Sequence, residues 1–298
     1  MLVHLTLMLS LTTASQAEWQ TDTTFAVPAG TRLELQNVTG NVTISAWNRS
    51  DVRVRADHGR RSSVAIELTG SNLRLRPQSD RGIMNLGGIA DYHLTIPVSM
   101  AIQISGMHAD VTIEGTRSDI KVQTVSGDIA VTGGDGTLAL TTIDGMISVR
   151  DGAGRLEATT TSDDVVVDGF RGGIRVEAVS GDISLRRVDS RDVFAEAVSG
   201  EVEYEGTVRD DGTYLFSTHS GDLVVAIPEN ANVLIRAVAS MGDVESTFTL
   251  PTAARSGRRE RSYRLGTGSA SMELKVFSGD VRLVRPSEIR SRNDDEEN

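Results

Sequence analysis

The sequence has no cysteine among its 298 residues, which excludes disulfide bonds, thiolate catalysis and zinc sites built on cysteine. Aromatic residues make up only 4% of the chain, and this scarcity favours a narrow core filled by aliphatic side chains. Basic residues are outnumbered 30 to 41 by acidic ones, giving a formal net charge of -11. That charge opposes binding to nucleic acid or to an anionic membrane surface.

Long helical and long apolar segments are also scarce. Gly, Thr and β-branched residues interrupt every helical window, and after the N-terminus no run approaches the ~18–20 apolar residues of a membrane span. The opening LVHLTLMLSLTTASQA has Ser15 and Ala17 placed as in a cleavage site, so a signal peptide is predicted over residues 1–17. Its positive n-region is missing, and a buried first strand or helix is the alternative. We expect an exported chain, periplasmic, cell-surface or extracellular, without a membrane span after cleavage.

A short repeat dominates the rest of the sequence. The segment AVSGDISLRRV at 178–188 predicts a strand, a tight turn and a second strand, and it recurs as TVSGDIAV, AVSGEVEY, THSGDLVV and VFSGDVRL. The predicted turn positions are Gly40, Gly106, Gly127, Gly145, Asp163, Gly181, Gly200, Gly221, Gly242 and Gly279. From Gly106 to Gly242 they are 18 to 21 residues apart, and a gap of 37 before Gly279 indicates a loop insertion near 246–268.

Alternation within the repeat predicts half-buried strands. After the turns, the inward positions are occupied by Ile129 and Val131, Ile147 and Val149, Val165 and Val167, Ile183 and Leu185, Val202 and Tyr204, Leu223 and Val225, and Val281 and Leu283. Two strands in 18 to 21 residues are too short to fold alone, whereas stacked copies bury a continuous core. The predicted fold is therefore an all-β solenoid. A β-sandwich is the alternative, although a sandwich does not require a constant period.

The repeat also predicts the domain organisation. Residues 18–100 follow the same pattern less regularly and form N-terminal β coils and a cap, and residues 101–284 form the repeat solenoid with its insertion. The segment 285–298 ends in NDDEEN and is predicted to be a disordered acidic tail.

The order of motifs carries a family resemblance. FAVPAGTRLELQNVTGNVTISAW, then DYHLTIP, then tandem SGDI-type units resembles a bacterial adhesin-like family of β-strand repeat proteins, a domain of unknown function. The resemblance covers most of the chain after the leader. It implies an exported or envelope-associated β-solenoid, and it supplies no catalytic residues.

The Ser-Gly-Asp triplet has two interpretations. As a corner, it needs a Gly for positive φ and Ser and Asp side chains that bond to backbone N–H groups. The replacements IDGM and TSDD favour the corner, because a catalytic centre would not tolerate such changes. As a metal site, stacked triplets would form an acidic ladder able to bind calcium, composed of Asp128, Asp164, Asp182, Glu201, Asp222 and Asp243 and interrupted by Met146. The chain lacks the calcium-binding nonapeptide GGxGxDxUx, so no metal and no other cofactor is predicted.

Catalytic motifs are missing from the sequence. His58, His93, His108 and His219 are far apart and have no metal-ligand spacing, and GxSxG and phosphate-binding loops are absent. Two acidic pairs, Asp163 with Asp164 and Asp210 with Asp211, are interpreted as solvated loop acids rather than a glycosidase pair.

These observations predict a non-enzymatic structural or interaction protein of the cell envelope, whose partner is an envelope protein or polysaccharide. Outward strand residues are the candidate contacts, for example Lys121, Arg175, Arg186 and Glu203. Two alternatives stay open: an envelope-stress or signalling accessory protein, and a carbohydrate-active β-helix enzyme with a groove near 246–268.

Overall fold

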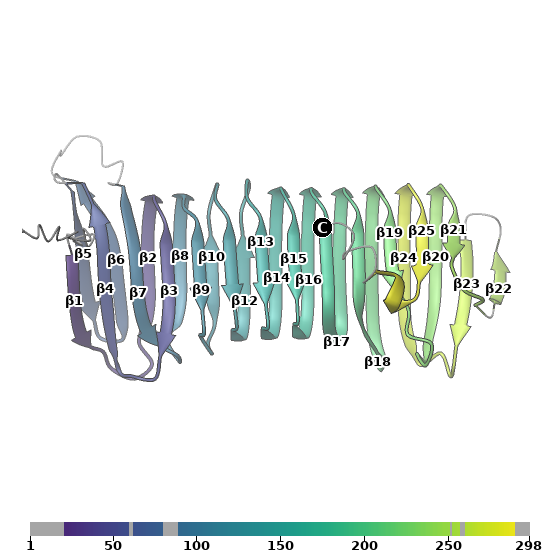
Figure 1. The fold of residues 1–298 in the computed structure, drawn as a ribbon, viewed down its shortest axis with the longest axis horizontal. Helices are drawn as coiled ribbons and strands as arrows, with labels where there is room; N and C mark the ends of the chain where they lie inside the picture. Colours follow the sequence, from purple (N-terminus) through teal and green to yellow (C-terminus); the bar gives the residue numbers. More distant parts are fainter. Residues whose placement is uncertain (1–20, 60–61, 80–88, 251, 257–259, 290–298) are drawn as a thin grey trace, which may run out of the picture.

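The structure, a computed structural model, describes residues 21–59, 62–79, 89–250, 252–256 and 260–289. This part of the chain forms an all-β solenoid, a long rod in which the strands of successive coils lie side by side (Figure 1). Each regular coil has two strands: the one that leads into the Ser-Gly-Asp corner belongs to face A, and the one that leaves it belongs to face B. The predicted β-solenoid is confirmed.

The central coils are parallel and in register. Face A contains β8 (Ala101–His108), β10 (Ile120–Gln123), β12 (Asp135–Thr141), β14 (Ala153–Ser162) and β16 (Arg171–Ser180). Face B contains β9 (Val111–Glu114), β11 (Ile129–Thr132), β13 (Ile147–Arg150) and β15 (Val165–Asp168). Two long strands, β17 (Ile183–Ser199) and β18 (Val202–Ser220), contribute to both faces. Equivalent residues of neighbouring coils are therefore aligned along the rod.

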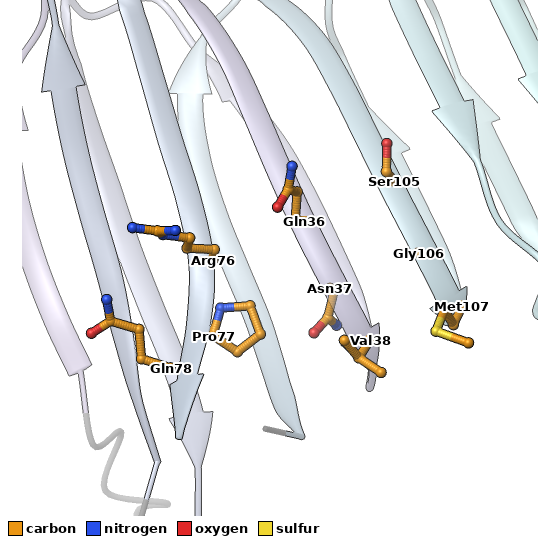
Figure 2. A pocket seen from close by; sticks show the side chains of 9 residues that line it. All are labelled: Gln36, Asn37, Val38, Arg76, Pro77, Gln78, Ser105, Gly106 and Met107. Carbon is orange, nitrogen blue, oxygen red and sulfur yellow. The ribbon is translucent and has the colours of Figure 1, made fainter. Parts of the chain in front are cut away.

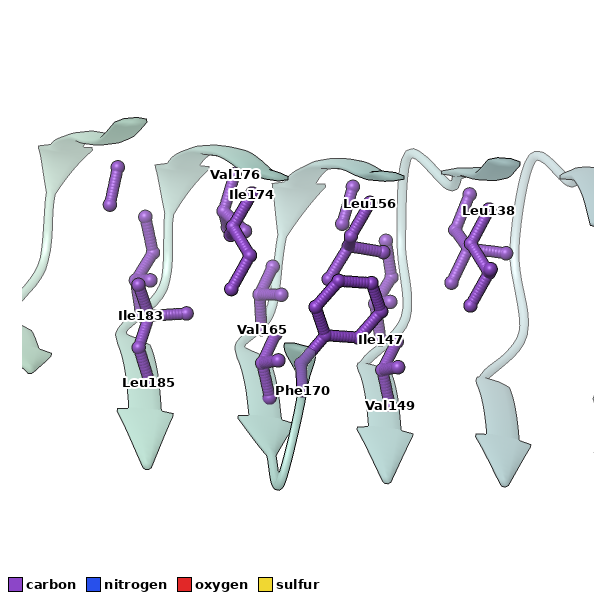
Figure 3. Packing of buried hydrophobic residues seen from close by; sticks show 14 of the residues in the cluster. Leu138, Ile147, Val149, Leu156, Val165, Phe170, Ile174, Val176, Ile183 and Leu185 are labelled. Carbon is purple, nitrogen blue, oxygen red and sulfur yellow. The ribbon is translucent and has the colours of Figure 1, made fainter. Parts of the chain in front are cut away.

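The inward side chains of the two faces meet in one aliphatic core (Figure 3). Leu138, Leu156 and Ile174 come from face A and pair in register, and Ile147 faces them from face B. Phe170 is fully buried at the corner opposite the Ser-Gly-Asp corner. Burying a Leu, Ile or Phe side chain completely stabilises the fold by about 1.5–3 kcal/mol. The predicted inward positions are confirmed, because each of them is buried.

At the N-terminal end the coils are not stacked in chain order. The strands are β1 (Thr21–Ala26), β2 (Arg32–Thr39), β3 (Val42–Trp47), β4 (Asp51–His58), β5 (Ser62–Thr69), β6 (Asn72–Ser79) and β7 (Ala90–Pro97). The β2–β3 coil lies between the β6–β7 layer and the β8–β9 coil, paired in parallel with both. Antiparallel pairing of β4 with β7 and β1, and of β5 with β6, then closes the end.

The C-terminal end is interleaved in the same way. Its strands are β19 (Leu223–Ala226), β20 (Val233–Met241), β21 (Val244–Ser246), β22 (Thr252–Ser256), β23 (Glu260–Leu265), β24 (Ala270–Ser278) and β25 (Val281–Val284). The last coil, β24–β25, lies between the β18–β19 coil and the β20–β21 coil. The predicted insertion contains the β22–β23 hairpin, which pairs antiparallel with β20. Antiparallel strands at both ends protect the rod from edge-to-edge pairing.

Two sequence predictions need correction. Gly106 is not a turn residue, because it lies inside β8; His108 pairs with Ser126, so the corner of that coil is at Ala109 and Asp110. The predicted disordered tail also begins too early. Residues 286–289 form a helical turn whose Ile289 is buried against apolar residues on the outside of face B. The predicted signal peptide lies outside the described residues.

Candidate interaction surface

At most of the corners, the Asp side chain accepts a hydrogen bond from the next coil. Asp128 Oδ1 accepts the backbone N–H of Met146 at 2.8 Å, and Asp182 Oδ1 accepts that of Glu201 at 2.7 Å. The same bond links Asp222 to Asp280 at 2.9 Å. These N–H groups belong to corners and have no ladder partner, so the carboxylates satisfy donors that the turn leaves open. The geometry accounts for an acid at this position without any bound ligand.

The predicted acidic ladder exists as a row, in a different order from the sequence. Along the rod we define the acidic row by its corner positions: Asp110, Asp128, Met146, Asp164, Asp182, Glu201, Asp222, Asp280 and Asp243. Asp280 separates Asp222 from Asp243 because the last coil is interleaved. Nowhere in the described ranges do three or more His, Cys, Asp or Glu side chains converge to hold a metal ion.

The histidines and paired acids do not assemble a reaction centre. His58 bonds to Thr21 Oγ1 and His108 to Ser126 Oγ, at 3.0 and 3.1 Å. His219 stacks on the ring of Phe277 with centroids 4.6 Å apart. His93 lies on face B, opposite Thr43.

The two acidic pairs are engaged separately. Asp164 accepts the N–H of Asp182 at 2.7 Å, while Asp163 occupies a corner position with a φ of 96°. Asp210 binds the amide of Asn232 at 2.9 Å, and Asp211 lies 3.4 Å from the guanidinium of Arg191. The carboxylates of Asp164, Asp210 and Asp211 thus each have a separate structural contact.

The predicted contact residues differ in how far they are accessible. Lys121 and Arg175 are exposed on face A, and the Arg175 guanidinium lies 4.1 Å from the centroid of the Phe194 ring. On face B, Glu203 is buried and forms an ion pair with Arg186 at 3.2 Å. Glu203 is therefore a poor contact for a partner.

An exposed apolar row beside the corners was missed by the sequence reasoning. The residue three positions before each member of the acidic row, just before the corner, faces outward, and so does Val38, three positions before Asn41 at the corner of the β2–β3 coil. We call this row the apolar stripe, and its members along the rod are Val38, Met107, Val125, Ile143, Thr161, Val179, Val198, His219, Phe277 and Ser240. Val125 follows the buried Thr124, so an apolar residue out of phase with its strand was the available signal.

Two depressions adjoin the stripe near its ends. The first has a volume of about 400 Å³ and opens where β2 and β6 separate after Leu35 and Leu75, so that Val38 and Met107 line it together with Pro77 (Figure 2). The second has a volume of about 570 Å³ and is lined by residues of β17, β18, β20 and β24, among them Val198, His219 and Phe277.

The protein is a two-faced β-solenoid, and equivalent surface residues are aligned from one coil to the next. The chain belongs to the Toastrack DUF4097 family, whose model matches residues 30–284. This membership confirms the family resemblance inferred from the sequence. In the described residues, no helix has the length and apolar character needed to cross a membrane.

Several solved bacterial structures are similar at low identity. A candidate adhesin from Bacteroides fragilis has 12% identity and a TM-score of 0.38, covering 88% of this chain and 96% of that one. A candidate lipid-binding protein from Parabacteroides distasonis has 11% identity and a TM-score of 0.47, covering 89% and 98%. A candidate cell adhesion protein from Clostridium sporogenes has 10% identity and a TM-score of 0.23, covering 89% and 99%. No curated protein matches the chain.

Proposed function

We propose that this chain is a non-enzymatic, adhesin-like interaction protein, exported or held in the cell envelope, that presents a repetitive β surface to an envelope protein or polysaccharide. The observation that supports the proposal is the alignment of equivalent outward side chains along the rod. On face A, Gln123, Thr141 and Thr159 are all exposed and stand in one row, at the ~4.8 Å spacing of adjacent strands.

Such a row suits a long partner better than a small ligand. Each coil offers a weak polar contact, and many equivalent contacts made by one chain act together, so that overall affinity exceeds that of any single coil. Affinity therefore depends on the length of the surface, because a longer stack of coils offers more equivalent contacts.

A carbohydrate-active enzyme is supported less well. Glycosidases need two carboxylates facing the scissile bond. Of the described residues that line the depression beside Phe277, Glu196 is the one carboxylate. The corner acids Asp128, Asp164 and Asp182 each accept a backbone N–H of the next corner, so hydrogen bonds within the rod already engage them.

Binding to envelope material tests the proposal. The purified chain is incubated with isolated envelope fragments and with insoluble envelope polysaccharide, and the bound fraction is measured by sedimentation. A variant with Gln123→Lys, Thr141→Lys and Thr159→Lys is expected to bind about tenfold more weakly, a difference of ~1.4 kcal/mol.

The matched control places the same charges on the opposite face. Thr112, Ala130 and Ser148 form an in-register row of half-buried, outward-facing residues on face B, and their replacement by Lys should leave binding unchanged. Equal loss in both variants contradicts a role for face A. Release of reducing ends from the polysaccharide contradicts the non-enzymatic assignment.

A further inference from the structure

We propose that the apolar stripe and the acidic row form one docking strip for a cationic amphipathic polypeptide. This inference rests on the proposed function and names the partner class for one edge of the rod. The two rows run side by side, because nine of the ten corners contribute one residue to each row, three positions apart.

The exposed apolar residues of the stripe occupy the same position in successive coils, whereas ordinary exposed apolar residues are scattered over a surface. Met107, Val125, Ile143, Val179 and Val198 are each between 42 and 51% exposed. Neighbouring coils are ~4.8 Å apart, so Met107, Val125 and Ile143 in three successive coils, and Val179 and Val198 in two, form two adjacent apolar segments separated by Thr161. Contiguous apolar surface of this kind marks interaction sites on soluble proteins.

The acidic row determines which partner fits. Carboxylates in adjacent coils, such as Asp164 and Asp182, repel each other by about 0.8 kcal/mol at ~5 Å in water. Ion pairing relieves part of the row, since Arg282 donates to Asp222. A partner that covers the stripe must bring positive charge alongside it, because a neutral or acidic partner would desolvate these carboxylates without compensation.

The dimensions suit a helix with an apolar face and a flank of Lys and Arg. Ten coils span on the order of 45 Å, the length of a helix of about 30 residues. The depression at Val38 and Met107 and the one beside Phe277 and His219 offer room for larger side chains near the two ends.

A model peptide tests the strip directly. A fluorescent amphipathic helix of about 30 Leu and Lys residues is titrated with the full chain, and binding is followed by anisotropy at low and high salt. The triple variant Val125→Thr, Ile143→Thr and Val179→Thr keeps β-branched residues but makes the stripe polar. The double variant Asp128→Asn and Asp182→Asn keeps the side-chain oxygens that accept the corner N–H bonds. Both the triple Thr variant and the double Asn variant are expected to bind the peptide at least about tenfold more weakly than the wild type.

Control variants on face B should bind the peptide like the wild type. Val166→Thr makes the same chemical change on an outward position of β15, and Glu114→Gln removes a charge from β9. Circular dichroism and thermal melting verify that each variant is folded, and only folded variants enter the comparison. A scrambled peptide of the same charge separates the apolar contribution from the electrostatic one.

Three results would overturn the inference. The first is unchanged binding in the Thr triple variant, and the second is equal binding of the scrambled peptide, which would leave charge alone as the cause. The third is a wild-type dimer that the Thr triple variant converts to monomer in sedimentation velocity, which would make the stripe a self-interface. Failure here is distinguishable from failure of the proposed function, because envelope binding through Gln123, Thr141 and Thr159 is measured separately.

Discussion

At each Ser-Gly-Asp corner one backbone position lies too close to the preceding coil to carry an ordinary side chain. A Cβ built on Gly181, whose φ is 147°, would lie 2.0 Å from the carbonyl oxygen of Asp163. The same atom on Gly145 would lie 2.3 Å from the carbonyl oxygen of Gly127. Glycine thus lets the corners stack as closely as the strands do.

Consecutive corners provide a matched pair of substitutions. Gly181→Ala should destabilise the chain by about 2 kcal/mol or more, because the new Cβ meets backbone that cannot move aside. Asp163→Gly should change stability by less than about 1 kcal/mol, since relief at a φ of 96° is offset by a more flexible unfolded chain. Urea unfolding followed by circular dichroism measures both. Equal shifts in the two midpoints would contradict the close-contact explanation.

Two buried tyrosines differ in their hydrogen bonds. Tyr92 is fully buried, burial raises the pKa of its phenol, and its hydroxyl has no hydrogen-bond partner among the described residues. The Tyr214 hydroxyl donates to the Ser190 carbonyl and accepts from the Arg209 N–H, both at 2.8 Å.

The corresponding phenylalanine variants should therefore move stability in opposite directions. Tyr92→Phe is expected to be neutral or to stabilise by up to about 1 kcal/mol, because it removes an unsatisfied buried group. Tyr214→Phe is expected to destabilise by about 1–2 kcal/mol, because it leaves a buried carbonyl and an N–H without their partner. Thermal melting compares the stability of the wild type with that of the two variants. A lower melting temperature for Tyr92→Phe would show that the Tyr92 hydroxyl has a hydrogen-bond partner in the wild type.

At the scale of strands and coils, part of the fold followed from local patterns. Alternation in segments such as Ile129 to Val131 predicted the inward face, and the spacing of the corners predicted the period. The stacking order could not be predicted, because every coil presents the same parallel edge and β24 fits β18 and β20 equally well. The apolar stripe was missed because alternation identifies inward positions, and Val125 lies in the opposite phase.

One ion pair ties the interleaved β2 strand to its neighbour β6. Arg74 and Asn72 donate to the Glu34 carboxylate at 3.0 and 3.2 Å, and the Arg74 hydrogen bond holds the pKa of Glu34 below its ordinary value of 4.5. A lowered pKa in the folded state means that the stabilisation is present above the unfolded pKa and is lost as pH falls through the folded one.

Glu34→Gln should accordingly make the chain less sensitive to acid. The variant is expected to be somewhat less stable than the wild type at pH 7 and to lose less stability between about pH 5 and pH 3. Urea midpoints at several pH values measure the difference. Glu114→Gln is the control, because that exposed residue lies on face B. If the urea midpoints of the Glu34→Gln variant and of the wild type changed with pH in the same way, the Glu34 carboxylate would not contribute to the loss of stability in acid.

At the scale of the whole molecule, the first and the last regular coils are interleaved with later and earlier parts of the described chain. The rod is closed by antiparallel strands at each end, while the first regular coil, β2–β3, and the last, β24–β25, are each one layer further in (Figure 1). A solenoid whose coils contact only their neighbours would otherwise fray from its terminal coils. Interleaving couples segments far apart in sequence, so loss of the last coil would separate β18 from β20.

Hydrogen exchange provides the test of this coupling. Backbone amides of Ala270–Val284 are expected to exchange as slowly as those of Val193–Ser199 in the middle of the rod, because β24 is hydrogen-bonded on both sides, to β18 and to β20. Amides of β23 (Glu260–Leu265), which belongs to the closing hairpin, should exchange faster, by about tenfold for each 1.4 kcal/mol of lower opening free energy. Mass spectrometry of proteolytic fragments resolves these segments. If Ala270–Val284 exchanged first, as expected for a fraying chain end, the last coil would be an independent terminal unit rather than a layer that holds the cap to the rod.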